Sequence, residues 1–265
     1  MRKAWIALAA MTAATGLLAP AARARAVTWI PVYDTHFAVN ANLGSFAGCD
    51  HTDTHVCDWL PQPVKSNLWA YPNPWPDTAT QRNYPVGGFY CPSRTLWISG
   101  GQLHIRMFRG AGAVCSAAVV PRRAMGRLFG RYTETFRVSR ITTGYKSAHL
   151  LWPAGSDQNF EVDFPENEWD TSINAFVHAA SQGGQLSFND GAAWGSWHTS
   201  EIDWTPGSLV FRLDGRVLGT ASGGWVPDEP MDWIIQNESA LNGESAPPFS
   251  SAQMDISHIA YAALG

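Results

Sequence analysis

The chain has 265 residues, of which 15% are charged and 12% aromatic, and its formal net charge at pH 7 is −4. This acidic balance argues against binding to nucleic acid or to an anionic membrane surface, because both attract positive charge. The 24 glycines, 17 prolines and 13 tryptophans are typical of short strands joined by tight turns, with aromatic rings available for packing or for ligands.

Residues 1–26 have the pattern of a secretory signal peptide. A basic start, Met1-Arg2-Lys3, precedes an apolar run, and Ala24-Arg25-Ala26 has the small residues of a cleavage site. No later stretch is apolar over the length that a membrane span requires. We expect a secreted protein, extracellular or periplasmic, with no membrane contact after cleavage; an uncleaved anchor is the alternative. Cleavage removes 4 of the 18 basic residues, which leaves 14 against 22 acidic ones and a net charge of −8.

The remaining residues, 27–265, are expected to form one domain, because no linker or compositional break divides them. The four cysteines of this part are even in number, as expected for disulfides in an exported protein. Their spacing matches no common zinc site. Of the three possible connectivities we favour Cys49–Cys57, which closes a short loop, together with Cys91–Cys115, which joins neighbouring strands.

The first third of the domain has an irregular pattern, rich in proline and aromatic residues between positions 67 and 85. Trp69 and Tyr71 in this stretch could stack on a sugar ring or pack the loop against the domain, and the sequence favours neither. Further along, alternating or wholly apolar segments separated by turn residues predict strands. They span residues 95–99, 102–108, 114–120, 130–138, 147–152, 172–179, 186–188, 197–204, 208–213, 231–237 and 254–262. No helical period persists, so we expect an all-β protein, a two-sheet antiparallel β-sandwich.

The segment FEVDFPE at 160–166 carries the main chemical signal. In a strand, Glu161 and Asp163 lie on one face, and the apolar residues between them lie on the other. Glu166 joins the carboxyl face only if the strand contains one extra residue. Pro165 marks where such a β-bulge would lie, because a bulge tolerates a residue without an N–H donor.

The spacing of these carboxyl groups predicts a retaining glycosidase pair. Four strand steps of roughly 3.3 Å put the Cα atoms of Glu161 and Glu166 about 13 Å apart, and inward-leaning side chains would bring the carboxyl groups to about 5 Å. With Asp163 between them, one group should keep its proton at neutral pH. A nucleophile and a general acid would then share one strand; the alternative is an acidic, solvated strand face.

Several segments together resemble glycoside hydrolase family 16. The EVDFPE stretch matches that family's bulged E-x-D-x-x-E signature, and GRYTETFRV (130–138), WHTSEIDWTPGSLVFRLDGRVL (197–218) and MDISHIAYA (254–262) are similar to family strands in the same order. The stretches EVDFPE, FVH (176–178) and WIIQNE (233–238) especially resemble a branch of secreted bacterial members. The resemblance implies a concanavalin A-like jelly roll with a concave substrate cleft. It assigns Glu161 as nucleophile, Glu166 as acid/base and Asp163 as the assisting carboxylate.

The chain departs from the family just before the signature, where KSAHLLWP (146–153) replaces the common W-P-A-x-W-L. Leu150 takes the usual position of a cleft tryptophan, and Trp152, two residues later, is a candidate for contact with a sugar. His178 could contact Asp163 or a sugar hydroxyl, or it could be a buried histidine bonded to backbone. Further candidates for substrate binding are Trp169, Trp194, Trp197, Gln236 and Glu238.

The resemblance also implies a partner and a metal. The substrate would be a polysaccharide with internal β-linkages, most simply a β-1,3- or mixed β-1,3/1,4-glucan, bound by the cleft of a monomer. No catalytic cofactor is expected, but Asp255 matches a position that binds a structural calcium ion in many family members. A transglycosylase, which uses a sugar hydroxyl in place of water, and a non-catalytic lectin are the alternatives. A lectin would normally have lost one of the carboxylates.

Overall fold

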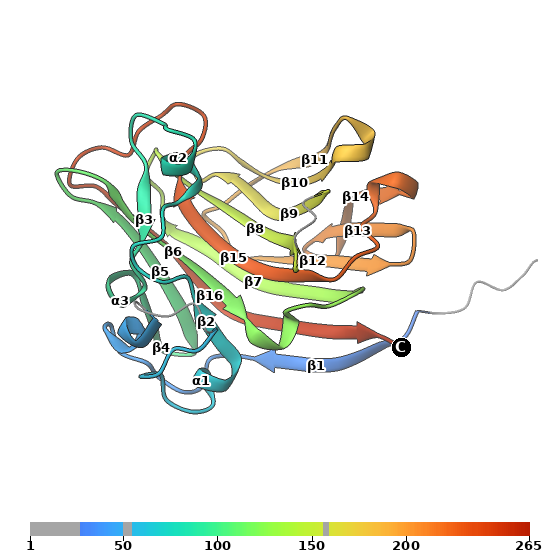
Figure 1. Ribbon diagram of the computed structural model, residues 1–265, viewed down its shortest axis with the longest axis horizontal. Helices are drawn as coiled ribbons and strands as arrows, with labels where there is room; N and C mark the ends of the chain where they lie inside the picture. The colour runs from blue at the N-terminus through green and yellow to red at the C-terminus, as the bar shows by residue number, and fades with distance from the viewer. Residues whose placement is uncertain (1–26, 50–54, 156–158) are drawn as a thin grey trace, which may run out of the picture.

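The structure is a computed structural model that describes residues 27–49, 55–155 and 159–265. The signal peptide predicted at 1–26 lies outside this part of the chain. Strands dominate the fold (Figure 1). They are β1 (Trp29–Thr35), β2 (Leu68–Ala70), β3 (Gly88–Tyr90), β4 (Leu96–Ser99), β5 (Gln102–Arg109), β6 (Val114–Pro121), β7 (Gly130–Arg140), β8 (Tyr145–Pro153), β9 (Phe160–Glu168), β10 (Ser172–Ala179), β11 (Gly184–Ala193), β12 (His198–Thr205), β13 (Ser208–Leu213), β14 (Arg216–Ser222), β15 (Met231–Ser239) and β16 (Ser251–Leu264). Single helical turns are α1 (Val64–Asn67), α2 (Thr78–Gln81) and α3 (Pro92–Thr95).

The strands form two sheets that meet at β6. One sheet runs β11-β10-β9-β8-β15-β6 and the other β5-β16-β7-β12-β13-β14. β6 connects them because Val114 and Cys115 pair with β5, whereas 117–119 pair with β15. β1 pairs with β16, β4 with β5, and β2 and β3 with β6, where β3 runs parallel. The predicted all-β sandwich of antiparallel sheets is confirmed.

The two sheets pack face to face over an aromatic core. The ring of Phe164 on β9 lies 5.6 Å from that of Phe211 on β13, and Tyr132 on β7 lies 5.5 Å from Trp233 on β15. Each of these side chains is 2% exposed or less. Full burial of a side chain of this size contributes roughly 1.5–3 kcal/mol. Because strand residues alternate between faces, the opposite face of the β8, β9, β10 and β15 sheet is left for the cleft.

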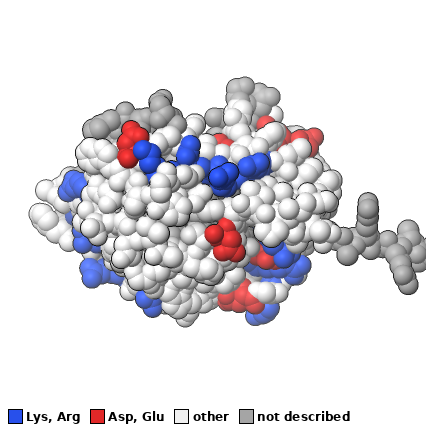
Figure 2. Space-filling view, turned by 90° about the horizontal axis from the view of Figure 1, so that it is seen from below, with Lys and Arg blue, Asp and Glu red and all other residues white. Residues whose placement is uncertain are grey.

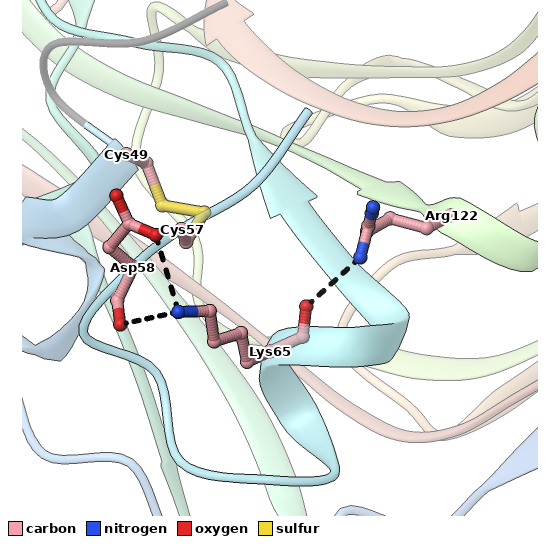
Figure 3. The surroundings of a disulfide bond; sticks show 5 residues. All are labelled: Cys49, Cys57, Asp58, Lys65 and Arg122. Atoms are coloured by element: carbon pink, nitrogen blue, oxygen red, sulfur yellow. Dashed lines mark hydrogen bonds and ion pairs between the residues drawn. A yellow bond between two sulfur atoms is a disulfide. The ribbon is translucent and has the colours of Figure 1, made fainter. Parts of the chain in front are cut away.

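Both predicted disulfides are present. Cys49 and Cys57 close a short loop, and Cys91 and Cys115 join the segment after β3 to β6. Near the first disulfide, Lys65 donates hydrogen bonds to the backbone and the carboxylate of Asp58 (Figure 3). These contacts join Asp58, which follows Cys57, to α1. Disulfides persist in oxidising compartments, which agrees with an exported protein.

The surface carries both signs of charge. On the face shown in Figure 2, basic and acidic side chains occur near one another within a mostly uncharged surface. The sheet β5-β16-β7-β12-β13-β14 is called the outer sheet below. On it, Arg131 donates a hydrogen bond to Asp203 at 2.8 Å and lies 3.3 Å from Glu201. These side chains are partly exposed, between 12% and 33%, and ion pairs that water reaches contribute roughly 0–1 kcal/mol each. In the described part of the chain, no helix is long and apolar enough to cross a membrane.

Candidate active site

Strand β9 contains the predicted bulge. Against β10, Asp163 pairs with Phe176 and Glu166 with Asn174, so three residue steps on β9 face two on β10. The same shift occurs against β8. Pro165, which follows a cis peptide bond, lies within the extra step. The bulge returns Glu166 to the face of Glu161 and Asp163, as the sequence predicts, while Phe164 packs into the core.

Asp163 lies at the buried base of this face, with 1% of its surface exposed. Its Oδ2 atom is 3.4 Å from Nε2 of His178 on β10, and neither carboxyl oxygen accepts a hydrogen bond within the described ranges. Burial, followed by the charges of Glu166 and Glu161, raises the pKa of Asp163 well above its ordinary value. Asp163 is therefore the carboxyl group of the site that most readily holds a proton.

Glu161 is partly buried and lies close to both of these neighbours. Single ligand atoms of Glu161, Asp163 and His178 all lie within 4.8 Å of one another. Burial and the charge of Glu166 raise the pKa of Glu161 above its ordinary value, although His178 and the positive charges of Lys146 and Arg82 oppose this shift. A carboxylate surrounded by these groups can ionise beside a protonated Asp163.

Glu166 has a partner that the sequence analysis did not include. Nζ of Lys146, at the start of β8, lies 2.7 Å from Oε1 of Glu166. The two side chains are only 6% and 15% exposed. Lysine is almost never buried unless it is paired with a charge, so the single lysine directly before the buried strand predicted at 147–152 was a usable sequence signal.

A cleft runs across these strands on both sides of Glu161. Its larger cavity has a volume of about 570 Å³, and a second cavity of about 300 Å³ lies beside it. Glu161 and Trp152 line both cavities. Other residues lining the larger cavity are Tyr71, Trp75, Arg82, Tyr90, Leu150 and Gln236, and His178 lines the smaller one. Of the predicted binding residues, the structure thus brings Trp152, Gln236, Tyr71 and His178 to the cleft.

The prediction that Trp169 and Trp194 stack on substrate is wrong, because both side chains lie in the core. Trp169 is 1% exposed and donates its indole N–H to the hydroxyl of Ser147 at 2.7 Å. Trp194 is 0% exposed and its ring lies 5.7 Å from that of Phe136. A sugar ring cannot reach either side chain, so the burial of these tryptophans excludes them from substrate stacking.

Two more predicted binding residues are buried beneath the cleft lining. Trp69 is 3% exposed, and its ring lies 5.3 Å from that of Tyr71, so it packs the loop rather than presenting a face to substrate. Glu238 is 1% exposed and accepts a hydrogen bond from the backbone N–H of Thr78 at 3.0 Å. The prediction that Trp69 and Glu238 contact substrate is therefore wrong, although Glu238 keeps an electrostatic influence on the site.

Trp197 lies outside the two cavities. The guanidinium of Arg137 is 4.8 Å from the centre of its ring, and the same arginine lies 3.3 Å from Asp255. A cation over an aromatic face contributes about 0.5–1 kcal/mol at an exposed position. The ring of Trp197 packs against Arg137 and lines neither cavity, so its predicted role in the cleft is wrong.

Replacing Trp152 with alanine tests the cleft directly. Because Trp152 lines both cavities, we expect KM for the polysaccharide substrate to rise about tenfold, equivalent to about 1.4 kcal/mol of binding, with kcat within about threefold of wild type. Trp197→Ala is the matched control, and it should leave both constants unchanged. Initial rates over a range of polysaccharide concentrations measure both. Equal effects of the two substitutions would contradict this placement of the cleft.

The surroundings of Asp255 do not fit the calcium ion that the resemblance implies. Its Oδ1 atom lies 2.7 Å from Nδ1 of His104 and accepts from the amide of Gln253 at 2.8 Å, while Oδ2 faces Arg137. Calcium takes six to eight oxygen ligands, whereas these neighbours are nitrogen groups, two of which are N–H donors. Asp255 is instead the centre of a polar cluster on the outer sheet.

This cluster makes stability depend on pH. Burial raises the pKa of Asp255, but hydrogen bonds from His104, Gln253 and Ser139 outweigh it and lower the pKa from 3.8 to about 2. A lowered folded-state pKa gives stability that is complete above pH 4 and is lost as the pH falls towards 2. After allowance for solvent screening, Asp255→Asn should lower the free energy of unfolding at pH 7 by about 1–2 kcal/mol.

Urea unfolding at pH 7, 4, 3 and 2.5 measures this difference, which should shrink below pH 4. Asp228→Asn, at an exposed position, should change little at any of these pH values. A difference between Asp255→Asn and wild type that stays constant down to pH 2.5 would show that the charge of Asp255 does not stabilise the fold.

Comparison with known proteins identifies the architecture. No protein-family model and no curated protein sequence matches the chain. Among solved structures, the laminarinase from Rhodothermus marinus matches with a TM-score of 0.68 and 19% identity, over 91% of this chain and 100% of that one. The chain has the laminarinase fold. Two further matches agree with this assignment.

SCLam, a non-specific endo-β-1,3(4)-glucanase from family GH16, matches with a TM-score of 0.65 and 13% identity over 90% of this chain and 93% of that one. The catalytic domain of an endo-1,3-β-glucanase (laminarinase) from Thermotoga petrophila matches with a TM-score of 0.65 and 12% identity, over 89% of this chain and 98% of that one. Because each of these matches covers about nine tenths of this chain, the shared fold extends over most of both sheets.

Proposed function

We propose that the chain is a secreted member of glycoside hydrolase family 16, a retaining endo-β-glucanase. The observation that carries this proposal is the position of Glu161, Asp163 and Glu166 on one bulged strand, in a molecule with the laminarinase fold. The fold alone supplies no chemistry, since one fold can hold many functions. The three carboxyl groups beside an aromatic-lined cleft supply it.

In the first step, a carboxylate oxygen of Glu161 attacks the anomeric carbon and forms a covalent glycosyl ester. The bond from this carbon to the leaving oxygen breaks, and its electron pair stays on that oxygen, which takes a proton from Glu166. Asp163, protonated because of its burial, can donate a hydrogen bond to Glu161 before attack. His178 borders the same group.

In the second step, water replaces the leaving sugar. Glu166, now ionised, accepts a proton from the water, whose oxygen bonds to the anomeric carbon. The ester bond to Glu161 breaks, and its electron pair returns to the carboxylate. Two successive inversions leave the configuration unchanged, so the product has the β-configuration of the substrate. A transglycosylase would differ only by placing a sugar hydroxyl where this water reacts.

The substrate that we propose is a β-1,3-glucan or a mixed β-1,3/1,4-glucan. Support comes from the neighbours, which are named laminarinases or β-1,3(4)-glucanases. Cavities on both sides of Glu161 offer room for sugar units on each side of a cleaved bond, as endo-cleavage requires. The two disulfides support export, which places the enzyme where it can meet a polymer.

A polysaccharide panel tests the proposal. Purified protein is incubated with laminarin, barley mixed-linkage glucan, cellulose and agarose, and reducing ends and product sizes are followed. We expect oligosaccharides of several lengths from laminarin or the mixed-linkage glucan, with β-anomers formed first in proton NMR. Initial α-anomers would contradict the retaining mechanism. Binding without any release of reducing ends would favour a lectin, and longer products in the presence of acceptor oligosaccharides would favour a transglycosylase.

A further inference from the structure

The start of strand β8 places a lysine among the carboxyl groups of the site. Lys146 pairs in register with Glu238 on the neighbouring β15. On its other side, its ammonium group lies 2.7 Å from Oε1 of Glu166 on β9. Lys146 is only 5% exposed as a residue and lines neither of the two cavities of the cleft. Among the residues assigned to bond cleavage, its direct contact is with Glu166, although its charge also acts on Glu161 and Asp163.

The surroundings keep this lysine charged. Burial alone would lower the pKa of Lys146, but the negative charges of Glu166, Glu238 and Asp163 outweigh it and raise the pKa above its ordinary value of 10.5. A buried ammonium with a bonded carboxylate forms a stronger contact than a surface pair, because little water screens it. The Lys146–Glu166 contact is therefore a fixed feature of the site at neutral pH.

We propose that Lys146 is a positioning residue for the acid/base, which holds the Glu166 carboxylate through Oε1 and stabilises its negative charge while Glu166 acts as a base. This inference rests on the proposed function. A cation at this position has opposite consequences for the two steps. It works against donation of a proton by Glu166 in the first step, and it favours the ionised Glu166 that must accept a proton from water in the second.

The second step is therefore the one that loses most when Lys146 is removed. In Lys146→Met, nothing holds Oε1 or balances the charge of Glu166, so the glycosyl ester on Glu161 should be hydrolysed slowly. The first step should be spared, above all for a substrate whose leaving group departs without a proton. Because kcat/KM reports the first step for such a substrate while kcat reports the second, the two constants should respond differently.

The experiment uses 2,4-dinitrophenyl β-laminaribioside with wild type, Lys146→Met and Lys146→Arg. Dinitrophenolate leaves unaided, and the amplitude of its initial burst counts the active sites, so unfolded protein does not distort kcat. For Lys146→Met we expect kcat per site to fall about tenfold or more, with kcat/KM within about threefold of wild type. Lys146→Arg, which keeps the charge, should recover most of kcat.

A structural role would give a different result. Equal losses in kcat and kcat/KM, an unchanged kcat, or identical behaviour of the Met and Arg variants would overturn the inference. If Lys146→Met does not fold, Lys146→Met/Glu166→Gln removes both charges and is compared with Glu166→Gln alone. Equal kcat values support the inference, and a further tenfold loss in the double variant overturns it. A wild type without any burst would overturn the proposed retaining function itself, and the inference with it.

Discussion

Glu161→Ser is expected to lower kcat on the polysaccharide by about 10⁴-fold or more while the protein stays folded. Serine has no carboxylate with which to form the glycosyl ester, and its hydroxyl is shorter by two bonds and is not ionised at neutral pH. The fold should tolerate the change, since Glu161 is partly buried among carboxyl groups and its removal relieves their mutual repulsion. Rates come from reducing-end assays, and folding from circular dichroism and thermal unfolding.

Two comparisons separate a nucleophile from a residue that merely supports the site. Glu201→Ser removes a glutamate that pairs with Arg131 and Arg212 on the outer sheet, and it should leave activity within about twofold of wild type. In addition, Glu161→Ser should couple α-laminaribiosyl fluoride to an acceptor sugar, because the α-fluoride mimics the ester that the variant cannot form. Full hydrolysis by Glu161→Ser, or loss of coupling along with hydrolysis, would exclude the assigned role.

The central strands could be predicted because local rules and burial agree there. Strand β7 alternates buried and partly buried side chains over most of its length, and β13 does the same. The bulge in β9 followed from parity alone, since Glu166 could reach the face of Glu161 only with one extra residue. Strand alternation and the bulge depend only on residues close together in the chain, so both can be predicted from the sequence.

Two strands near the sheet edges, β14 and β11, could not be predicted fully, because their own sequences do not carry a strand pattern. β14 (Arg216–Ser222) is largely exposed and contains a glycine, so its sequence lacks the apolar alternation that marks a strand. β11 (Gly184–Ala193) was predicted only at 186–188, because its second half is polar and exposed. These segments are strands because they complete the hydrogen bonding of a neighbour, Phe211 pairing with Gly219 for example. That requirement is set by the sheet and not by the segment.

The sequence could predict only some of the residues that line the cleft. Tryptophan serves equally well in a core and on a sugar platform, so the composition of the segment could not separate Trp169 from Trp152. Strand parity settles part of this, because Leu150 and Trp152 share the face of Lys146 on β8 while Leu151 packs inside. The contact of Lys146 with Glu166 depends on how two strands pair, and no local pattern contains that information.

Glu166→Ala should divide substrates by the quality of their leaving group. On polysaccharide, where the departing sugar oxygen needs a proton, kcat should fall by about 10³-fold. On 2,4-dinitrophenyl β-laminaribioside the first step needs no proton, so the glycosyl ester should form at nearly the wild-type rate. Hydrolysis of this ester then lacks its base, and turnover should stop after a burst.

Azide tests the role of Glu166 further, because this anion attacks the glycosyl ester without a base. Added to Glu166→Ala, it should restore turnover of the dinitrophenyl substrate about tenfold or more and yield β-laminaribiosyl azide, since its attack on the ester of Glu161 inverts the α-linkage. Polysaccharide hydrolysis should stay slow, because azide supplies no proton to the leaving oxygen. An α-azide product would show that no ester forms on Glu161. Equal losses on both substrates without rescue would mean that Glu166 supports the strand and transfers no proton.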